Sequence, residues 1–142
     1  GQPNLIQFYC QALVEHLDQE NSRVLTLNDL GDVYANEDFR TFVLGTFMDN
    51  TTHLEKVIVF AVMAEYGNDH SFDLAAINEA LARRQVDTFV LDMEQACRNL
   101  ELAGTFASSG REYRFATPLF PRMLTEKHDP QFLFQKLVRE GL

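Results

Sequence analysis

Hydrophobic residues recur every three to four positions along most of the chain, and this spacing is typical of amphipathic α-helices. Serine, threonine, asparagine, aspartate and glycine residues interrupt the pattern and predict where the helices begin and end. Alternation of polar and apolar residues appears after Gly110. The sequence therefore predicts a mainly α fold, with helices over residues 4–18, 26–35, 37–48, 53–66, 74–84, 87–102, 118–127 and 131–139.

Several predicted helices begin with a residue whose side chain can accept a hydrogen bond from a free backbone N–H. Thr26 is followed three residues later by Asp29, which is the spacing of a capping box. Gly67 follows the 53–66 helix and is expected in the left-handed conformation that commonly ends a helix. The remaining predicted N-caps are Asn36, Thr51 or Thr52, Asp73, and Asp87 or Thr88.

The 53–66 helix is apolar almost all the way round in its middle, because Val57 to Ala64 is an unbroken apolar run. A helix of this kind is buried, so we expect it at the centre of the core, with Ile58 inside. Other helices show a single apolar face. We expect one face to consist of Phe39, Phe42, Val43 and Phe47, and another of Phe89, Met93, Ala96, Cys97 and Leu100.

Two short segments around the turn Ser108-Ser109-Gly110 have the pattern of a β-hairpin. In the second segment Tyr113 and Phe115 alternate with Glu112 and Arg114, as in a half-buried strand. Three helices followed by a hairpin is the order of a winged-helix module, which is a helix-turn-helix with a wing. The predicted domains are a helical lid or linker bundle at 1–50, the winged-helix domain at 51–127 and a C-terminal helix at 128–142.

Charge is distributed unevenly over the 142 residues, which carry a formal net charge of −9. Residues 1–70 contain 3 Lys+Arg against 11 Asp+Glu, whereas residues 71–127 contain 7 against 8. An acidic surface repels nucleic-acid phosphates, so the composition disfavours non-specific DNA binding. The near-neutral second half still leaves room for local contact with DNA.

Composition also bears on the cellular compartment. Apolar residues make up 46%, but no apolar run approaches the roughly 20 residues of a membrane span. The first residues lack the basic region of a signal peptide. Cys10 and Cys97 have no CxxC spacing and are interpreted as reduced thiols. We therefore expect a cytoplasmic protein without membrane contact.

No enzyme motif is present, because the chain contains no GxSxG, no HExxH and no Walker A loop. His16 is interpreted as a core-edge residue and His53 as a structural residue, whereas His70 and His128 fall in predicted loops. We expect no catalytic residue, no metal site and no cofactor bound by this chain alone. The acidic first half is interpreted as a solvated face.

Direct DNA binding by the winged helix is one alternative, in which the third helix of the module reads bases in the major groove. The start of that helix is acidic, with Asp87, Asp92 and Glu94, which argues against this alternative. Val90 and Leu91 add apolar area to its outer face, which indicates either packing against further protein or tight packing within the chain. The residues that would carry DNA binding are Arg83, Arg84, Arg98, Arg111 and Arg114.

Two segments resemble a known family. Gly1-Gln2-Pro3 before the first helix is similar to the GxP motif of STAND and related AAA-like P-loop ATPases. Tyr113–Phe120 (YRFATPLF) resembles the wing strand and following helix of those proteins. The resemblance implies a helical lid and a winged helix that follow a nucleotide-binding core, and it implies that Pro3 packs near the adenine of ATP or ADP in the parent protein. Some members carry a phosphate-sensing histidine where this chain has Ala116-Thr117.

These observations favour a non-catalytic regulatory fragment of a larger P-loop NTPase, which acts as a nucleotide-responsive switch. Its expected partner is its own upstream NTPase core or another protein. By this resemblance the winged helix packs on the core with ADP and swings away with ATP. The alternatives are a stand-alone winged-helix transcriptional regulator that binds DNA and a protein-interaction module inside a larger assembly.

Overall fold

The computed structural model describes residues 5–22, 24–67, 70–117 and 119–125, together with residues 131, 134–135 and 138–139. Within these ranges the chain is mainly helical with a small two-stranded antiparallel sheet, so the predicted mainly α class is confirmed. In chain order the elements are α1 (Leu5–Gln19), α2 (Leu27–Ala35), α3 (Glu37–Asn50), α4 (His53–Tyr66), α5 (Leu74–Arg83), α6 (Val90–Leu102), β1 (Phe106–Ser109), β2 (Glu112–Phe115) and α7 (Leu119–Thr125).

Side-chain caps fix the starts of four helices as the sequence predicts. The capping box is complete, since Thr26 Oγ1 accepts from the Asp29 backbone N–H while the Asp29 carboxylate accepts from that of Thr26. Asn36, Thr52 and Asp73 cap α3, α4 and α5 in the same way, through the backbone N–H three residues ahead. These local interactions place the helix boundaries within a residue or two of the predicted ones.

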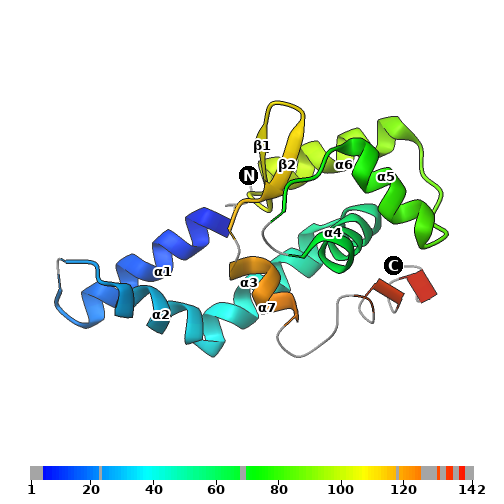
Figure 1. The fold of residues 1–142 in the computed structure, drawn as a ribbon. Helices are drawn as coiled ribbons and strands as arrows, with labels where there is room; N and C mark the ends of the chain where they lie inside the picture. Colours follow the sequence, from blue (N-terminus) through cyan, green and yellow to red (C-terminus); the bar gives the residue numbers. More distant parts are fainter. Residues whose placement is uncertain are drawn as a thin grey trace.

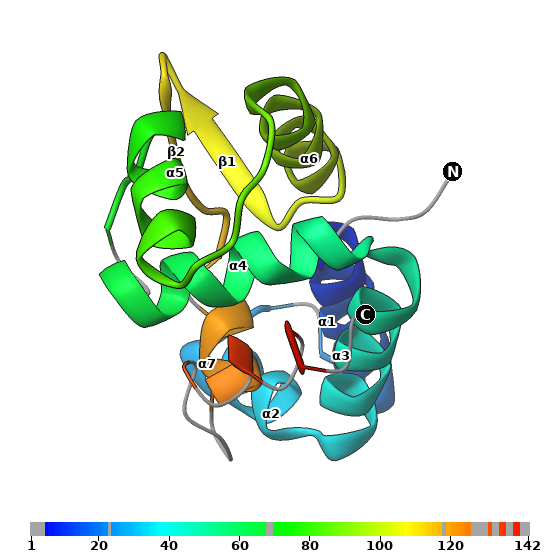
Figure 2. The same ribbon diagram turned by 90° about the vertical axis from the view of Figure 1, so that its right-hand side faces the viewer.

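The helices fall into two groups along the molecule. Figure 1 shows α1 and α2 side by side, extending from the rest of the chain and leading through α3 to α4. On the other side of α4, helices α5 and α6 and the hairpin lie together (Figure 2). Short helix α7 returns from the hairpin to pack against α3. The described elements thus form two groups. One is the antiparallel pair of helices α1 and α2, and the other consists of α5, α6 and the β-hairpin. Helices α3 and α4 join the two groups.

The predicted burial of α4 is confirmed, because every residue from Val57 to Met63 is buried and Ile58 has no exposed surface. Phe47 of α3 extends this core, since its ring contacts Phe60 edge-on at 6.5 Å between centroids and Phe120 of α7 at 4.9 Å. The apolar core is therefore continuous across residues 50 and 51, where the sequence places a domain boundary.

The hairpin pairs Phe106 with Phe115 and Ser109 with Glu112, so the loop consists of Gly110 and Arg111. Ser108 and Ser109 of the predicted 108–110 turn instead belong to β1, and only Gly110 lies in the loop. Gly110 takes a φ of 64° and supplies the left-handed position that a two-residue loop needs. On the edge of β2 that faces away from β1, the segment before α5 adds an isolated antiparallel bridge between Phe72 and Tyr113. Backbone hydrogen bonds of 2.8 and 2.7 Å join these two residues.

Two phenylalanines depart from the predicted apolar faces. Phe89 was expected in the core but is 80% exposed, because α6 begins at Val90 and Phe89 is its N-cap in extended conformation. An extended residue leaves the helical register that would bring it above Met93. Asp87 and Thr88, the predicted caps, lie before this start, and no side chain caps α6. Phe42 is 56% exposed although Phe47, on the same helix, is buried.

Among the helices that the structure describes, none is both long and apolar enough to cross a bilayer. The predicted C-terminal helix lies partly outside the described residues. Its described residues are helical, and one of them, Phe134, joins the core.

Candidate functional site

The predicted DNA-contacting arginines separate into two groups. Arg98 on α6, Arg111 in the hairpin loop and Arg114 on β2 are exposed. The structure records no ion pair between any of these three and a described acidic residue. Each of these three side chains is accordingly accessible to a ligand.

Arg83 and Arg84 are instead engaged within the chain through Glu65 of α4. Arg83 forms an ion pair with the Glu65 carboxylate, and Arg84 Nη1 donates to Glu65 Oε2 at 2.9 Å. Arg84 is largely buried: its Nε donates to Gln131 Oε1 at 3.0 Å, and its guanidinium lies 5.7 Å from the centroid of the Phe134 ring. Arg84 therefore connects α4 and α5 to the described residues of the C-terminal segment. These contacts within the chain explain the position of the Arg84 side chain, so no bound nucleic acid is needed to explain it.

The start of α6 carries an exposed apolar patch made of Phe89, Val90 and Leu91. Nearby in sequence are two exposed carboxylates, Asp87 and Asp92. Large apolar side chains that cluster on a surface commonly mark a protein contact. We call these three residues the α6 apolar patch.

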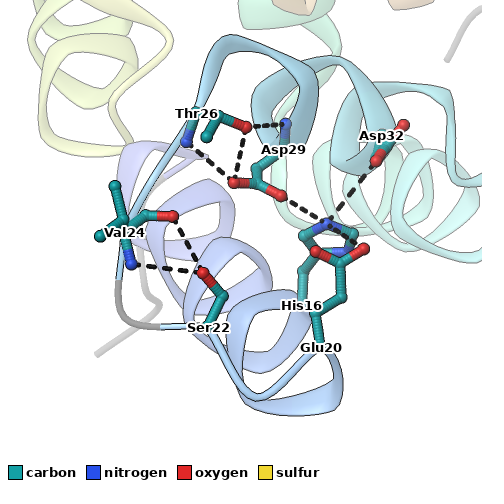
Figure 3. A network of polar contacts seen from close by, with 7 residues as sticks. All are labelled: His16, Glu20, Ser22, Val24, Thr26, Asp29 and Asp32. Atoms are coloured by element: carbon teal, nitrogen blue, oxygen red, sulfur yellow. Dashed lines mark hydrogen bonds and ion pairs between the residues drawn. The ribbon is translucent and has the colours of Figure 1, made fainter.

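A second feature lies in the α1–α2 hairpin, where three carboxylates surround one imidazole (Figure 3). His16 Nε2 lies 3.0 Å from Asp29 Oδ1, 3.5 Å from Glu20 Oε1 and 3.7 Å from Asp32 Oδ2. One nitrogen and three carboxylate oxygens, one from each residue, all lie within 4.8 Å of one another. We call these four residues the His16 cluster, and they form the described side-chain group that could hold a metal ion.

The cluster is built by helical spacing on two antiparallel helices. His16 lies in the last turn of α1, and Glu20 directly follows this helix with its backbone N–H donating to the His16 carbonyl at 3.2 Å. Asp29 and Asp32 are three residues apart on α2, so each pair lies on one side of its helix or of the turn that continues it. Asp29 is held in place because its second oxygen, Oδ2, accepts from the Thr26 N–H at 2.8 Å and from the Thr26 hydroxyl at 2.9 Å.

The backbone hydrogen bond from Thr26 lowers the pKa of Asp29 below its ordinary value, and the Thr26 hydroxyl and His16 act in the same direction. Asp29 is thus a carboxylate at neutral pH even though its side chain is only 8% exposed. Its other oxygen, Oδ1, is hydrogen-bonded to His16 Nε2 at 3.0 Å.

A cavity of about 450 Å³ lies beside the cluster. His16 and Asp32 form part of its wall, together with Phe39 and the exposed Phe42 of α3. Glu15 and Asp38 add further carboxylates. The cavity gives solvent and small solutes access to His16 from the side of α3.

The interpretation of His16 as a core-edge residue missed these partners. The signal was present in the sequence as a histidine and an acid four residues apart, followed after a break by two acids three residues apart. Without the pairing of α1 with α2, nothing in the sequence brought Asp29 to His16, since 13 residues separate them. The other described histidines, His53 and His70, are exposed. Partial desolvation of the His53 ring, and then the charge of Lys56, lower the pKa of His53.

The two cysteines differ in environment. Cys10 is exposed on α1 and Cys97 is buried in α6, and both are free thiols. Burial raises the pKa of Cys97 to about 12, so its thiol stays protonated and unreactive at neutral pH.

The predicted adenine contact, Pro3, lies outside the described residues. Comparison with known proteins adds no further residue to these sites. No protein-family model, curated protein or solved structure matches the chain. Its function must therefore be inferred from its own residues and their geometry.

Proposed function

We propose that residues 51–127 form a winged-helix module that binds protein through α6, and that the chain is the regulatory lid and winged-helix part of a larger P-loop ATPase. In this role the chain carries no chemistry of its own. ATP or ADP is bound by the upstream core, with Pro3 near the adenine, and the module responds to which nucleotide is present.

The order of elements supports a winged helix. Helices α4, α5 and α6 precede the hairpin, and the extended segment between α4 and α5 bridges to β2 through Phe72 and Tyr113. A winged helix has this arrangement of three helices with a small sheet, in which α6 occupies the place of the recognition helix.

The α6 apolar patch is the observation that carries the proposal of protein binding. In a helix-turn-helix that reads DNA, residues near the start of the recognition helix contact base edges. Here that end presents Phe89, Val90 and Leu91 between Asp87 and Asp92. Apolar groups flanked by carboxylates fit the surface of another protein better than a polyanion, because the carboxylates would face phosphates.

The nucleotide-binding core of the same polypeptide is the partner that we propose for the patch. A switch requires two states whose contacts differ between the nucleotides. Docking of α6 on the core in the ADP state would bury the patch, and its release in the ATP state would expose it.

The coding sequence upstream of residue 1 gives the first test. A Walker A loop followed by an apolar strand ending in acids, within roughly 200–300 residues, would support the ATPase assignment. An initiator codon directly or shortly before the Gly1 codon would overturn it.

Binding between the separately expressed core and this chain gives the second test, by calorimetry with ADP or a non-hydrolysable ATP analogue. We expect tighter binding with ADP, and we expect Phe89→Ser with Leu91→Ser to weaken it at least about tenfold. Leu102→Ser is the matched control, because Leu102 is also exposed, at 75%, but lies at the far end of α6. An equal loss of affinity in both variants would contradict docking through the patch.

Duplex DNA binding is a second candidate, favoured by the exposed Arg98, Arg111 and Arg114, none of which forms an ion pair with a described acidic residue. Three phosphate contacts would make log K fall with log salt with a slope near −3, at roughly 0.9 per contact. Arg98→Glu should then abolish binding without unfolding the chain. Negligible affinity for duplex DNA at low salt would exclude this candidate.

A further inference from the structure

We infer that the His16 cluster is a binding site for a divalent transition-metal ion, with Zn²⁺ as its expected occupant. The site would join α1 to α2 and would be separate from the α6 apolar patch and from nucleotide binding. Its donors are one imidazole nitrogen and three carboxylate oxygens, from His16, Glu20, Asp29 and Asp32.

The donor spacing fits a tetrahedral ion. With bonds of about 2.0–2.2 Å, two ligands of a tetrahedral Zn²⁺ lie roughly 3.3–3.6 Å apart. The distances from His16 Nε2 to the three carboxylate oxygens are 3.0, 3.5 and 3.7 Å. The donor atoms lie within 4.8 Å of one another, so a pair of donors must approach by at most roughly 1.2–1.5 Å to close the tetrahedron. Glu20 and Asp32 are the exposed members whose side chains can move.

Protonation of His16 alone can neither hydrogen-bond nor neutralise all three carboxylates of the cluster. A neutral imidazole has one N–H at most at Nε2, so it can donate to a single carboxylate, and Asp29 is the nearest. An imidazolium supplies one positive charge against three negative charges. Among the described residues, no lysine or arginine forms an ion pair with Glu20, Asp29 or Asp32. A divalent cation would offset more of this charge and would contact all four donors.

Two observations distinguish the cluster from a solvated group of surface acids. The central donor is a histidine with only 19% of its side chain exposed, and Asp29 is nine-tenths buried with one oxygen locked by Thr26. The adjoining cavity of about 450 Å³ opens onto His16 and Asp32, which provides an entry path for a hydrated ion. The His16 and Asp29 donors are thus held in position by the fold before an ion binds, whereas Glu20 and Asp32 lie at the surface.

The mixed donor set selects the kind of ion. Ca²⁺ and Mg²⁺ prefer oxygen ligands alone, whereas an imidazole nitrogen favours Zn²⁺ and neighbouring transition metals. Four protein donors would complete a tetrahedral shell and leave no open position for substrate, which is typical of a structural site.

The packing of α1 and α2 indicates what such an ion would do. Leu13 and Val33 are buried on these two helices, but neither belongs to the continuous core around α4. Among the side chains of α1 and α2 that the structure describes, these two are the buried apolar ones, and a helical pair with so small an apolar contact gains most from a metal cross-link. Bound Zn²⁺ would therefore stabilise the α1–α2 hairpin against separation and unfolding.

Metal binding by the whole chain tests the site. Zn²⁺ affinity would be measured at neutral pH by competition with a chromogenic chelator, in a Cys10→Ser background so that the exposed thiol does not contribute. Asp32→Asn removes one exposed donor, and His16→Gln removes the central one. Asp18→Asn is the matched control, because Asp18 is an exposed acid of α1 that lies outside the cluster.

We expect a micromolar or tighter Kd in the Cys10→Ser protein and in Asp18→Asn, and at least about a tenfold weaker Kd in Asp32→Asn and His16→Gln. Zn²⁺ at 100 times Kd should raise Tm by roughly 5–10 °C, and only in the proteins with an intact cluster. Absence of binding at millimolar Zn²⁺, or the same Kd in Asp32→Asn and Asp18→Asn, would overturn the site. If His16→Gln fails to fold, the comparison of Asp32→Asn with Asp18→Asn decides alone.

Discussion

Replacing Phe47 by alanine would test whether α3 and α4 belong to one cooperative unit. The Phe47 side chain is 5% exposed and packs edge-on against Phe60 of α4 and Phe120 of α7. Truncation of a buried phenylalanine costs about 3–5 kcal/mol, which includes the lost transfer free energy and the cavity left behind. Since a domain of this size has a total stability of about 5–15 kcal/mol, the loss should be plain in any equilibrium measurement.

The assay is urea unfolding followed by far-ultraviolet circular dichroism at constant temperature. Phe42→Ala is the matched control, because Phe42 lies on the same helix and is 56% exposed. We expect the midpoint to fall strongly for Phe47→Ala, to change little for Phe42→Ala and to remain a single transition. Two transitions, of which only one responds to Phe47→Ala, would mean that the boundary at residue 50 separates independent domains. Equal losses in both variants would refute the packing argument itself.

Three further predictions concern single groups. Ile58→Asp places a charge in a fully buried position of α4 and should lower the free energy of unfolding by about 4 kcal/mol or more; an unchanged thermal melt would contradict the central place of α4. Because its folded-state pKa is lowered, Asp29 stabilises the protein above its unfolded pKa, and this contribution is lost as pH falls through the folded value. Urea midpoints should therefore fall less between about pH 5 and pH 2 in Asp29→Asn than in the unchanged chain, and parallel pH curves would contradict this. Maleimide should modify Cys10 quickly at neutral pH and Cys97 only on unfolding, and equal rates in the folded chain would show that Cys97 is not buried.

The parts of the fold that depend on neighbouring residues could be predicted from the sequence. Thr26, Asn36, Thr52 and Asp73 cap their helices because the N–H groups that they accept from lie three residues away. The burial of α4 also followed, since a helix that is apolar on all sides has no stable position at the surface.

The start of α6 was predicted wrongly because two neighbouring residues could each cap the helix. Asp87 and Thr88 are both good N-caps, yet α6 begins at Val90, so Phe89 falls outside the helix and its side chain leaves the expected face. The contacts of His16 were missed for a different reason. They depend on how α1 packs against α2, which the hydrophobic pattern does not specify at the level of single side chains.

The bridge between Phe72 and Tyr113 has a consequence for self-association. A two-stranded hairpin exposes unpaired backbone groups on its outer edges, and such edges can pair with a second chain and begin aggregation. On the outer edge of β2, the N–H and C=O of Tyr113 are already bonded to Phe72. Since β2 has only four residues and alternate residues face outward, this one bridge interrupts the edge at its centre. An incoming strand therefore finds no continuous row of free amides along β2.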